Sequence, residues 1–316
     1  MKHTIQNNKL ITVFDVVQFI TSVAESRFNI SMLDGVDDYR IILTHGVIGE
    51  VINLIENNYY GLDKNKLIFI CNNIELTKLL HSHNLSAHTI SEYIYSDDDM
   101  YCVYEDVEKY WDCIFPGRES KTFGIFNREY NINLYKMYKD PAYPIVRNLM
   151  PQLFNEARCG LMTTETEGSC LSVGEMLLCG IPVVTVDIVT NQGEDIYYPI
   201  NKHSYKNTYD IVLPHTLGGR ELWLDDTNSI YCNRNDDNIE AAINVVISTY
   251  FDKHEIRNDF MSKLSFQRHQ FVYLLRGVLN ELGMINVNPN EFINLPYGNS
   301  TINTTQWNKI WPKLLY

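Results

Sequence analysis

Short apolar runs alternate with helical patterns between Tyr39 and Ile90, and this alternation restricts the fold more than any other feature of the chain. Three runs predict buried strands: Arg40–His45, Lys66–Cys71 and Ser86–Ile90. Two helical patterns separate them, Val47–Glu56 and Ile74–His81. Strands that alternate with helices of this length form a parallel sheet covered on both faces, with right-handed crossovers. The sequence therefore predicts an α/β fold with a Rossmann-like layer.

A second series of the same kind follows Pro116, where proline and glycine interrupt the pattern after an acidic, tyrosine-rich stretch. Its expected strands are 122–126, 160–164 and 182–186, and its expected helices are 145–157, 172–179, 239–251 and 260–282. We therefore expect two Rossmann-like domains, residues 1–116 and 117–285, with an interdomain cleft between them. Residues 286–316 form a tail that is expected to pack back on the first domain.

The composition is that of an ordinary globular protein with an acidic balance. The 316 residues suit two domains of this size. The formal net charge of -13 argues against nucleic acid as a partner. The seven cysteines include no CxxC pair and predict free thiols in a reducing compartment. Residues 1–9 lack the apolar core of a secretion signal, so we expect a cytoplasmic location.

The segment Glu167–Val184 carries the most informative motif of the chain. A predicted strand ends at Thr164, a turn that contains glycine follows, and a helix is expected to begin near Ser172. The free N–H groups and the positive end of that helix would form an anion site suited to a diphosphate. Gly168 would let the backbone approach a ligand closely. This turn would lie at the carboxyl edge of the sheet, where open α/β folds bind ligands.

The run Glu-Gly-Ser-Cys-Leu-Ser-Val-Gly-Glu-Met-Leu-Leu-Cys-Gly-Ile-Pro-Val-Val resembles the donor-binding signature of retaining glycosyltransferases of family 4 and related GT-B enzymes. Both glutamates, their spacing and the Cys-Gly-x-Pro-Val-Val ending match that signature. Cys170 departs from the usual glycine and Met176 from the usual alanine, and the resemblance extends over roughly residues 121–251. It implies that Glu167 contacts the donor sugar and that Glu175 holds the ribose hydroxyls. It places four backbone amides near the sugar and the diphosphate: Ser169, Cys170, Leu171 and Ser172.

A plainer interpretation of the same helix start stays open. Ser172 and Glu175 fit a capping box, Ser-x-x-Glu, which satisfies two backbone donors without any ligand. That interpretation leaves Glu167 without a task, so we prefer the donor site.

Five further residues complete the donor site that the resemblance implies. Gly218 and Gly219 resemble the family's glycine-pair loop, although they lie about thirty residues further along than usual. Residues 192–194 (Gln-Gly-Glu) have the usual spacing but lack the double glycine, so we prefer Gly218 and Gly219; an ordinary turn is the other alternative. The family also uses an arginine after the first strand of the second domain, with a lysine several residues on. Arg128 and Lys136 are the residues that we match to this pair, and surface roles are the alternative. His45 ends a strand of the first domain and would approach the sugar, unless it is structural.

The reaction that these residues imply is hexosyltransferase-like. A sugar moves from a nucleotide-diphosphate donor, such as a UDP-sugar, to a hydroxyl of a carbohydrate, lipid-linked or other acceptor, with retention of configuration. Asp97–Asp99 resembles the metal-binding motif of another transferase class, but an acidic run is usually a solvated loop, so no metal or other cofactor is expected. The basic stretch 253–276 leaves a membrane surface open as a partner. The alternatives are a sugar-nucleotide epimerase of the same fold, a transferase that modifies DNA bases, and a non-catalytic partner subunit.

Overall fold

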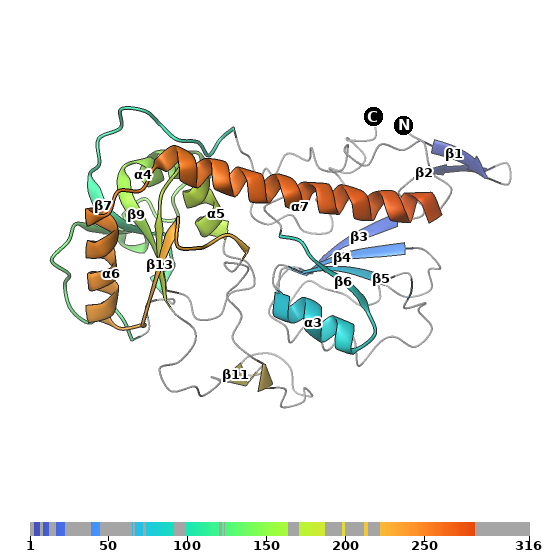
Figure 1. Cartoon of the computed structure of the whole chain (residues 1–316), viewed down its shortest axis with the longest axis horizontal. Helices are drawn as coiled ribbons and strands as arrows, with labels where there is room; N and C mark the ends of the chain where they lie inside the picture. Colours follow the sequence, from blue (N-terminus) through green and yellow to red (C-terminus); the bar gives the residue numbers. More distant parts are fainter. Residues whose placement is uncertain are drawn as a thin grey trace. The chain divides into compact units, whose positions relative to one another are not determined.

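The computed structural model divides by its contacts into two units (Figure 1). Unit 1 comprises Met1–Ser96, Tyr198–Leu213 and Ser265–Tyr316, and unit 2 comprises Asp97–Tyr197 and Pro214–Leu264. The structure describes residues 3–6, 9–12, 17–22, 39–44, 65, 67–71, 74–91, 99–119, 122, 124–163, 171–186, 198–199, 212–213 and 222–281. Each unit contains a parallel sheet of its own.

The sheet of unit 1 has the strand order β3-β4-β5-β6, and every pair in it is parallel. The strands are β3 (Val17–Ser22), β4 (Tyr39–Thr44), β5 (Leu67–Cys71) and β6 (Ser86–Thr89). Helix α3 (Ile74–Ser82) connects β5 to β6 and contacts both. The predictions of strands at 40–45, 66–71 and 86–90 and of the helix at 74–81 are thus confirmed, whereas the expected helix at 47–56 lies outside the described residues.

Unit 2 contains a five-stranded sheet in the order β13-β10-β9-β7-β8, with parallel pairs throughout. Its strands are β7 (Trp111–Phe115), β8 (Leu134–Lys136), β9 (Ala157–Met162), β10 (Val183–Val186) and β13 (Ser229–Cys232). Numbered along the chain, this is the 2-1-3-4-5 order of a doubly wound α/β sheet. The direction of winding changes between β7 and β9, so the topological switch point lies there.

The remaining elements are mostly short. Unit 2 adds η5 (Met137–Lys139), η6 (Arg147–Leu149), α4 (Met150–Asn155), α5 (Leu171–Leu178) and α6 (Asp236–Ser248). Two antiparallel pairs lie in unit 1: β1 (His3–Gln6) with β2 (Lys9–Thr12), and β11 (Tyr198–Pro199) with β12 (Val212–Leu213). Helix α7 (Lys253–Glu281) contributes its residues to both units. Among the described helices, none is long and apolar enough to cross a membrane.

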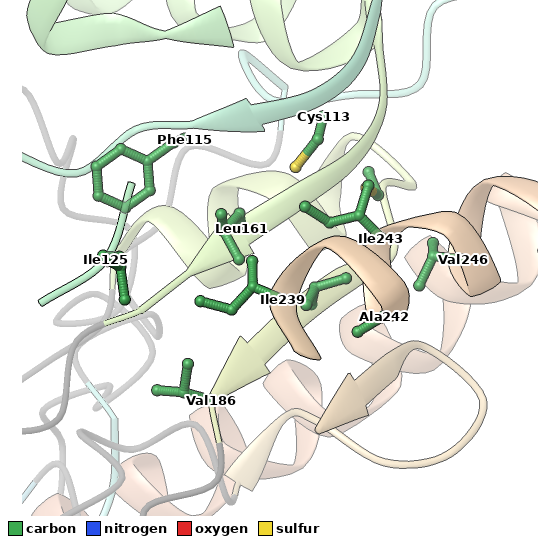
Figure 2. Close-up of a cluster of buried hydrophobic side chains, with 11 residues drawn as sticks. Cys113, Phe115, Ile125, Leu161, Val186, Ile239, Ala242, Ile243 and Val246 are labelled. Atoms are coloured by element: carbon green, nitrogen blue, oxygen red, sulfur yellow. The ribbon is translucent and has the colours of Figure 1, made fainter. Parts of the chain in front are cut away.

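Helices cover both faces of the unit 2 sheet. On one face α6 packs against alternate residues of β7, β9 and β10 (Figure 2). This cluster consists of Cys113, Phe115, Ile125, Cys159, Leu161, Val184, Val186, Ile239, Ala242, Ile243 and Val246. Gly160, between two members of the cluster, points to the other face, where Met176 of α5 lies against it. The buried faces on both sides explain why these strands have near-continuous apolar sequences.

The start of unit 2 differs from the sequence prediction. Residues 122–126 were expected to form a strand, and that expectation is wrong, because Gly124 and Phe126 have φ angles of 74° and 58°. The strand is Trp111–Phe115 instead, on the other side of Pro116. β8 also occupies a stretch in which no strand was expected. The helix predicted at 145–157 is limited to Met150–Asn155 plus one preceding 3₁₀ turn.

The C-terminus of α5 ends in a Schellman motif, as the glycine after the predicted helix suggests. The amide of Gly180 donates to the carbonyl of Leu177, and the amide of Ile181 donates to that of Met176, both at 3.0 Å. Gly180 has a φ of 71°, and a Cβ there would lie 2.4 Å from the carbonyl oxygen of Lys253. Both the backbone angle and the close approach restrict this position to glycine.

Replacing Gly180 with alanine is expected to lower the free energy of unfolding by about 2 kcal/mol, from the left-handed backbone and the contact with Lys253. Urea denaturation measures the effect. Gly277→Ala is the matched control, because nothing lies within 4 Å of the added Cβ and alanine favours the helix. Equal stability of the two variants would contradict the role assigned to Gly180.

Candidate functional site

The carboxyl ends of β7 and β9 form the topological switch point of the unit 2 sheet, which is the position where doubly wound folds bind ligands. Pro116, Gly117 and Arg118 follow β7 directly. Thr163 follows β9 and is fully buried. The chain then passes through the motif turn and enters α5 at Leu171. The segment that carries the glycosyltransferase resemblance therefore leaves the sheet at its switch point.

The loop after β7 presents an arginine that the sequence analysis did not single out. A Cβ on Gly117 would lie 2.3 Å from Cζ of Phe115, whose ring is buried in the core. Glycine is therefore required at position 117, because the Phe115 ring occupies the space that a Cβ would take. Arg118 is the next residue of this loop. The side chain of Arg118 is exposed, and it makes no hydrogen bond or ion pair with any residue that the structure describes. It is available to a ligand.

The structure changes which arginine follows the first strand of the second domain. That strand was expected at 122–126, which led to Arg128. With β7 as the first strand, the arginine after it is Arg118, and Lys121 follows three residues later, outside the described residues. The apolar run before Pro116 is the sequence signal that would have identified Arg118.

Arg128 and Lys136 have partners of their own. The guanidinium of Arg128 lies 2.8 Å from Asp237 and 2.6 Å from Glu240, both in α6. The ammonium group of Lys136 lies 4.0 Å from the centroid of the Phe126 ring, and burial lowers the pKa of Lys136. Both cations thus help to hold the segment before and through β8 in place.

Asp236, at the start of α6, holds the loop that precedes β8. Its carboxylate accepts hydrogen bonds from the amides of Phe126 and Asn127, at 2.6 and 3.0 Å, and from the Tyr130 hydroxyl at 2.8 Å. Burial alone would raise the pKa of Asp236, but these hydrogen bonds hold it below its ordinary value. The contact maintains Phe126 at its positive φ.

Asp236→Asn is expected to reduce the free energy of unfolding at pH 7 by about 2 kcal/mol, because the charged acceptor of three hydrogen bonds is lost. A carboxyl whose folded pKa is depressed stabilises the protein above its unfolded pKa, near 3.9, and loses that contribution as the pH falls through the folded pKa. The difference between variant and parent should therefore shrink below about pH 4. Urea titrations at pH 7 and pH 3 measure it; Asp237→Asn, at an 88% exposed side chain, is the control.

A second arginine, Arg234, reaches the same edge of the sheet from β13. Its Nε donates a hydrogen bond of 3.1 Å to the carbonyl of Thr163, the last described residue before the motif turn. A Cβ on Gly124 would lie 3.5 Å from its terminal nitrogen. Arg234 is therefore bonded to the end of β9 and lies close to the loop after β7. The sequence analysis missed it, although a cation directly after a strand of this sheet is a usable signal.

Helix α5 begins at Leu171, so Ser172 lies within its first turn. A capping box would need Ser172 at the N-cap position, before the first helical residue. The helical assignment of Leu171 therefore argues against the capping box. The first amides of α5 have no partner within the helix.

Glu175 is half-buried on α5 and faces a buried tyrosine. Burial raises the pKa of the Tyr101 hydroxyl, and the nearby carboxylate of Glu175 raises it further. The guanidinium of Arg147 lies 5.7 Å from the centroid of the Tyr101 ring. Glu175 thus belongs to a polar group with Tyr101 and Arg147, which the sequence did not predict.

Several predicted site residues lie outside the described residues. These are His45, Glu167, Gly168, Ser169, Cys170, Gly218 and Gly219. Their roles stay predictions. The structure does place α5 against β9, through Met176 and Gly160, and it pairs β9 with β7 in parallel, so the loops after these two strands leave the same edge of the sheet.

No protein-family model matches the sequence, and no curated protein matches it. Solved structures with a similar backbone include HepE from Anabaena in complex with UDP and glucose, at a TM-score of 0.45 and 11% identity over 76% of this chain and 72% of that one. Sucrose-phosphate synthase from Thermosynechococcus elongatus has a TM-score of 0.46 and 9% identity, over 81% of this chain and 69% of that one. The BGT of T4 phage in complex with its UDP-glucose substrate has a TM-score of 0.43 and 11% identity, over 86% of this chain and 100% of that one. Since these TM-scores are below 0.5, the function is inferred from the chain's own residues.

Proposed function

We propose that this chain is a glycosyltransferase of the GT-B kind, which moves a sugar from a nucleotide-diphosphate donor to a hydroxyl acceptor. One observation carries the proposal: the segment that resembles the donor signature leaves the unit 2 sheet at its topological switch point, beside the loop of Arg118. Arg118 is exposed there and makes no hydrogen bond or ion pair with the described residues, which supports a role in binding the diphosphate. The two domains, the interdomain cleft and the cytoplasmic location expected from the sequence are part of this proposal.

The departing diphosphate is stabilised by the N-terminal amides of α5 and by the guanidinium of Arg118. A helix N-terminus and an arginine fork are preorganised donors for phosphate oxygens, and they supply charge stabilisation without a metal ion. Arg234 acts through the backbone, because it holds the Thr163 carbonyl at the start of the motif turn. Glu167 orients the sugar and Glu175 the ribose, and transfer proceeds with retention, as the resemblance implies.

The test is a panel of UDP-, GDP- and ADP-sugars with the purified chain. A donor that binds only the native state should raise the melting temperature, and transfer or slow hydrolysis should release the nucleoside diphosphate. Glu167→Ala should abolish release, with at most a small change in the melting shift, because this carboxylate is expected to act on the sugar.

The rival functions give different results in the same assays. A new sugar epimer formed without acceptor would favour the epimerase, and binding without any turnover would favour a non-catalytic partner. No melting shift with any nucleotide sugar would overturn the proposal. Cys170→Gly, which restores the usual residue of the resembled signature, is the matched variant and should keep the melting shift.

A further inference from the structure

Unit 1 contains a groove that the donor site does not use. It has a volume of about 1230 Å³ and lies between β6, α3 and the second half of α7. The wall formed by α7 is fixed to the rest of unit 1 by a buried hydrogen bond of 2.9 Å, from the Ser91 amide to the Gln267 side chain. The volume exceeds that of pockets that enclose drug-sized ligands, so the groove has room for an oligomeric ligand.

The α7 wall carries two aromatic rings on one helical face. Phe266 and Tyr273 are spaced by seven residues and are 63% and 81% exposed. His269 and Gln270 lie between them on the same face, and Arg276 follows one turn later. Exposed rings that alternate with hydrogen-bonding side chains suit a ligand with both apolar faces and polar edges.

The opposite wall is polar and already ordered. In β6 and α3 the hydroxyl of Thr89 donates to that of Thr77 at 2.8 Å, and a ring nitrogen of His81 lies 2.9 Å from the carbonyl of Ala87. His88 lies in the same strand and also lines the groove. The side chains that face the groove therefore need little ordering when a ligand binds.

The charge of the groove is opposite to that of the chain. Among the described residues that line it, Arg276 is the one side chain charged at pH 7, and there is no aspartate or glutamate. Burial lowers the pKa of His88, so this histidine is neutral. The whole chain has 39 acidic and 26 basic residues. An acidic ligand is therefore favoured over a basic one in this groove.

We propose that this groove binds an acidic oligosaccharide, which is the acceptor of the sugar; that role, though not the binding, rests on the proposed function. The rings of Phe266 and Tyr273 lie against the apolar faces of successive sugar residues. The guanidinium of Arg276 pairs with the acidic group. The polar edge of β6 and α3 bonds the hydroxyls.

Calorimetry on the full chain tests this with two probes of equal length, hexagalacturonate and maltohexaose. We expect the acidic probe to bind at least tenfold more tightly, and added salt to weaken it. Tyr273→Ala should weaken both probes about tenfold. Arg276→Gln should remove the preference for the acidic probe and leave maltohexaose unchanged. Tyr250→Ala, at an 85% exposed tyrosine of unit 2, is the control and should change nothing.

Gly277→Trp provides a variant that does not threaten the fold, since a Cβ at this helical position meets nothing within 4 Å. Its indole should occupy the groove and abolish binding of both probes. The proposal is overturned if neither probe binds, if both bind equally, if the groove variants bind like the parent, or if a DNA oligonucleotide binds more tightly than hexagalacturonate. The melting shift with a UDP-sugar separates the two proposals. If the saccharides bind but no UDP-sugar raises the melting temperature, the donor site alone is refuted. If a UDP-sugar raises the melting temperature but neither saccharide binds, the groove proposal alone is refuted.

Discussion

Arg118→Ala is expected to weaken binding of a UDP-sugar roughly thirtyfold, whereas Arg128→Ala leaves it nearly unchanged. The guanidinium of Arg118 is exposed at the switch point and meets no other charge among the described residues. Charge-assisted bonds from arginine to a diphosphate contribute about 2 kcal/mol, which corresponds to that change in affinity. Arg128 already pairs with Asp237 and Glu240, so its loss affects the fold and not the ligand.

Calorimetric titration of both variants with UDP and a UDP-sugar measures the difference. Arg118→Lys should recover only part of the affinity, because an ammonium group lacks the planar fork that matches phosphate oxygens. Arg128→Ala should lower the free energy of unfolding, because the carboxylate of Glu240, whose side chain is only 11% exposed, loses its cationic partner. If Arg128→Ala lost its affinity for the UDP-sugar and Arg118→Ala kept it, Arg128 and not Arg118 would be the residue that contacts the diphosphate.

The assignment of the first strand of unit 2 shows what local sequence can and cannot predict. Residues 122–126 are rich in residues that favour strands, yet Gly124 and Phe126 take positive φ angles. The cause is a tertiary contact: the carboxylate of Asp236, 110 residues further along, accepts a hydrogen bond from the Phe126 amide. In contrast, β7 contains Asp112 and only three buried side chains, so its pattern is short and interrupted. The error at 122–126 thus comes from a long-range contact, whereas β7 was overlooked because its apolar run before Pro116 is short.

Elsewhere the periodicity was sufficient. β5, α3, β9, α5 and β10 lie within two or three residues of their predicted bounds. Each is an apolar run or a helical pattern bounded by glycine, proline or asparagine, so local and tertiary preferences agree. The site was predicted less fully, because its parts come from separate strand ends. A cation after a strand is a local signal for Arg118 and Arg234, but only the sheet order shows which strand ends lie next to each other.

Met176 is the residue at which this chain departs from the alanine usual in the resembled signature, and the structure accounts for it. Position 160 of β9 has no side chain, and a Cβ there would lie 2.0 Å from the Met176 sulfur. Met176 is fully buried, so the thioether has no other place to go. The glycine in the strand and the long side chain on the helix therefore form a matched pair.

A double-mutant cycle on this pair should show strong coupling. Met176→Ala leaves a cavity and should cost about 2–5 kcal/mol, and Gly160→Ala forces the buried sulfur aside and should cost about 1–3 kcal/mol. In Gly160→Ala/Met176→Ala the new methyl group meets no thioether and fills part of the cavity. The double variant should therefore be more stable than the sum of the single effects predicts, by at least about 1 kcal/mol. Urea denaturation of the four proteins measures the coupling, and strictly additive losses would show that Gly160 and Met176 do not share this space.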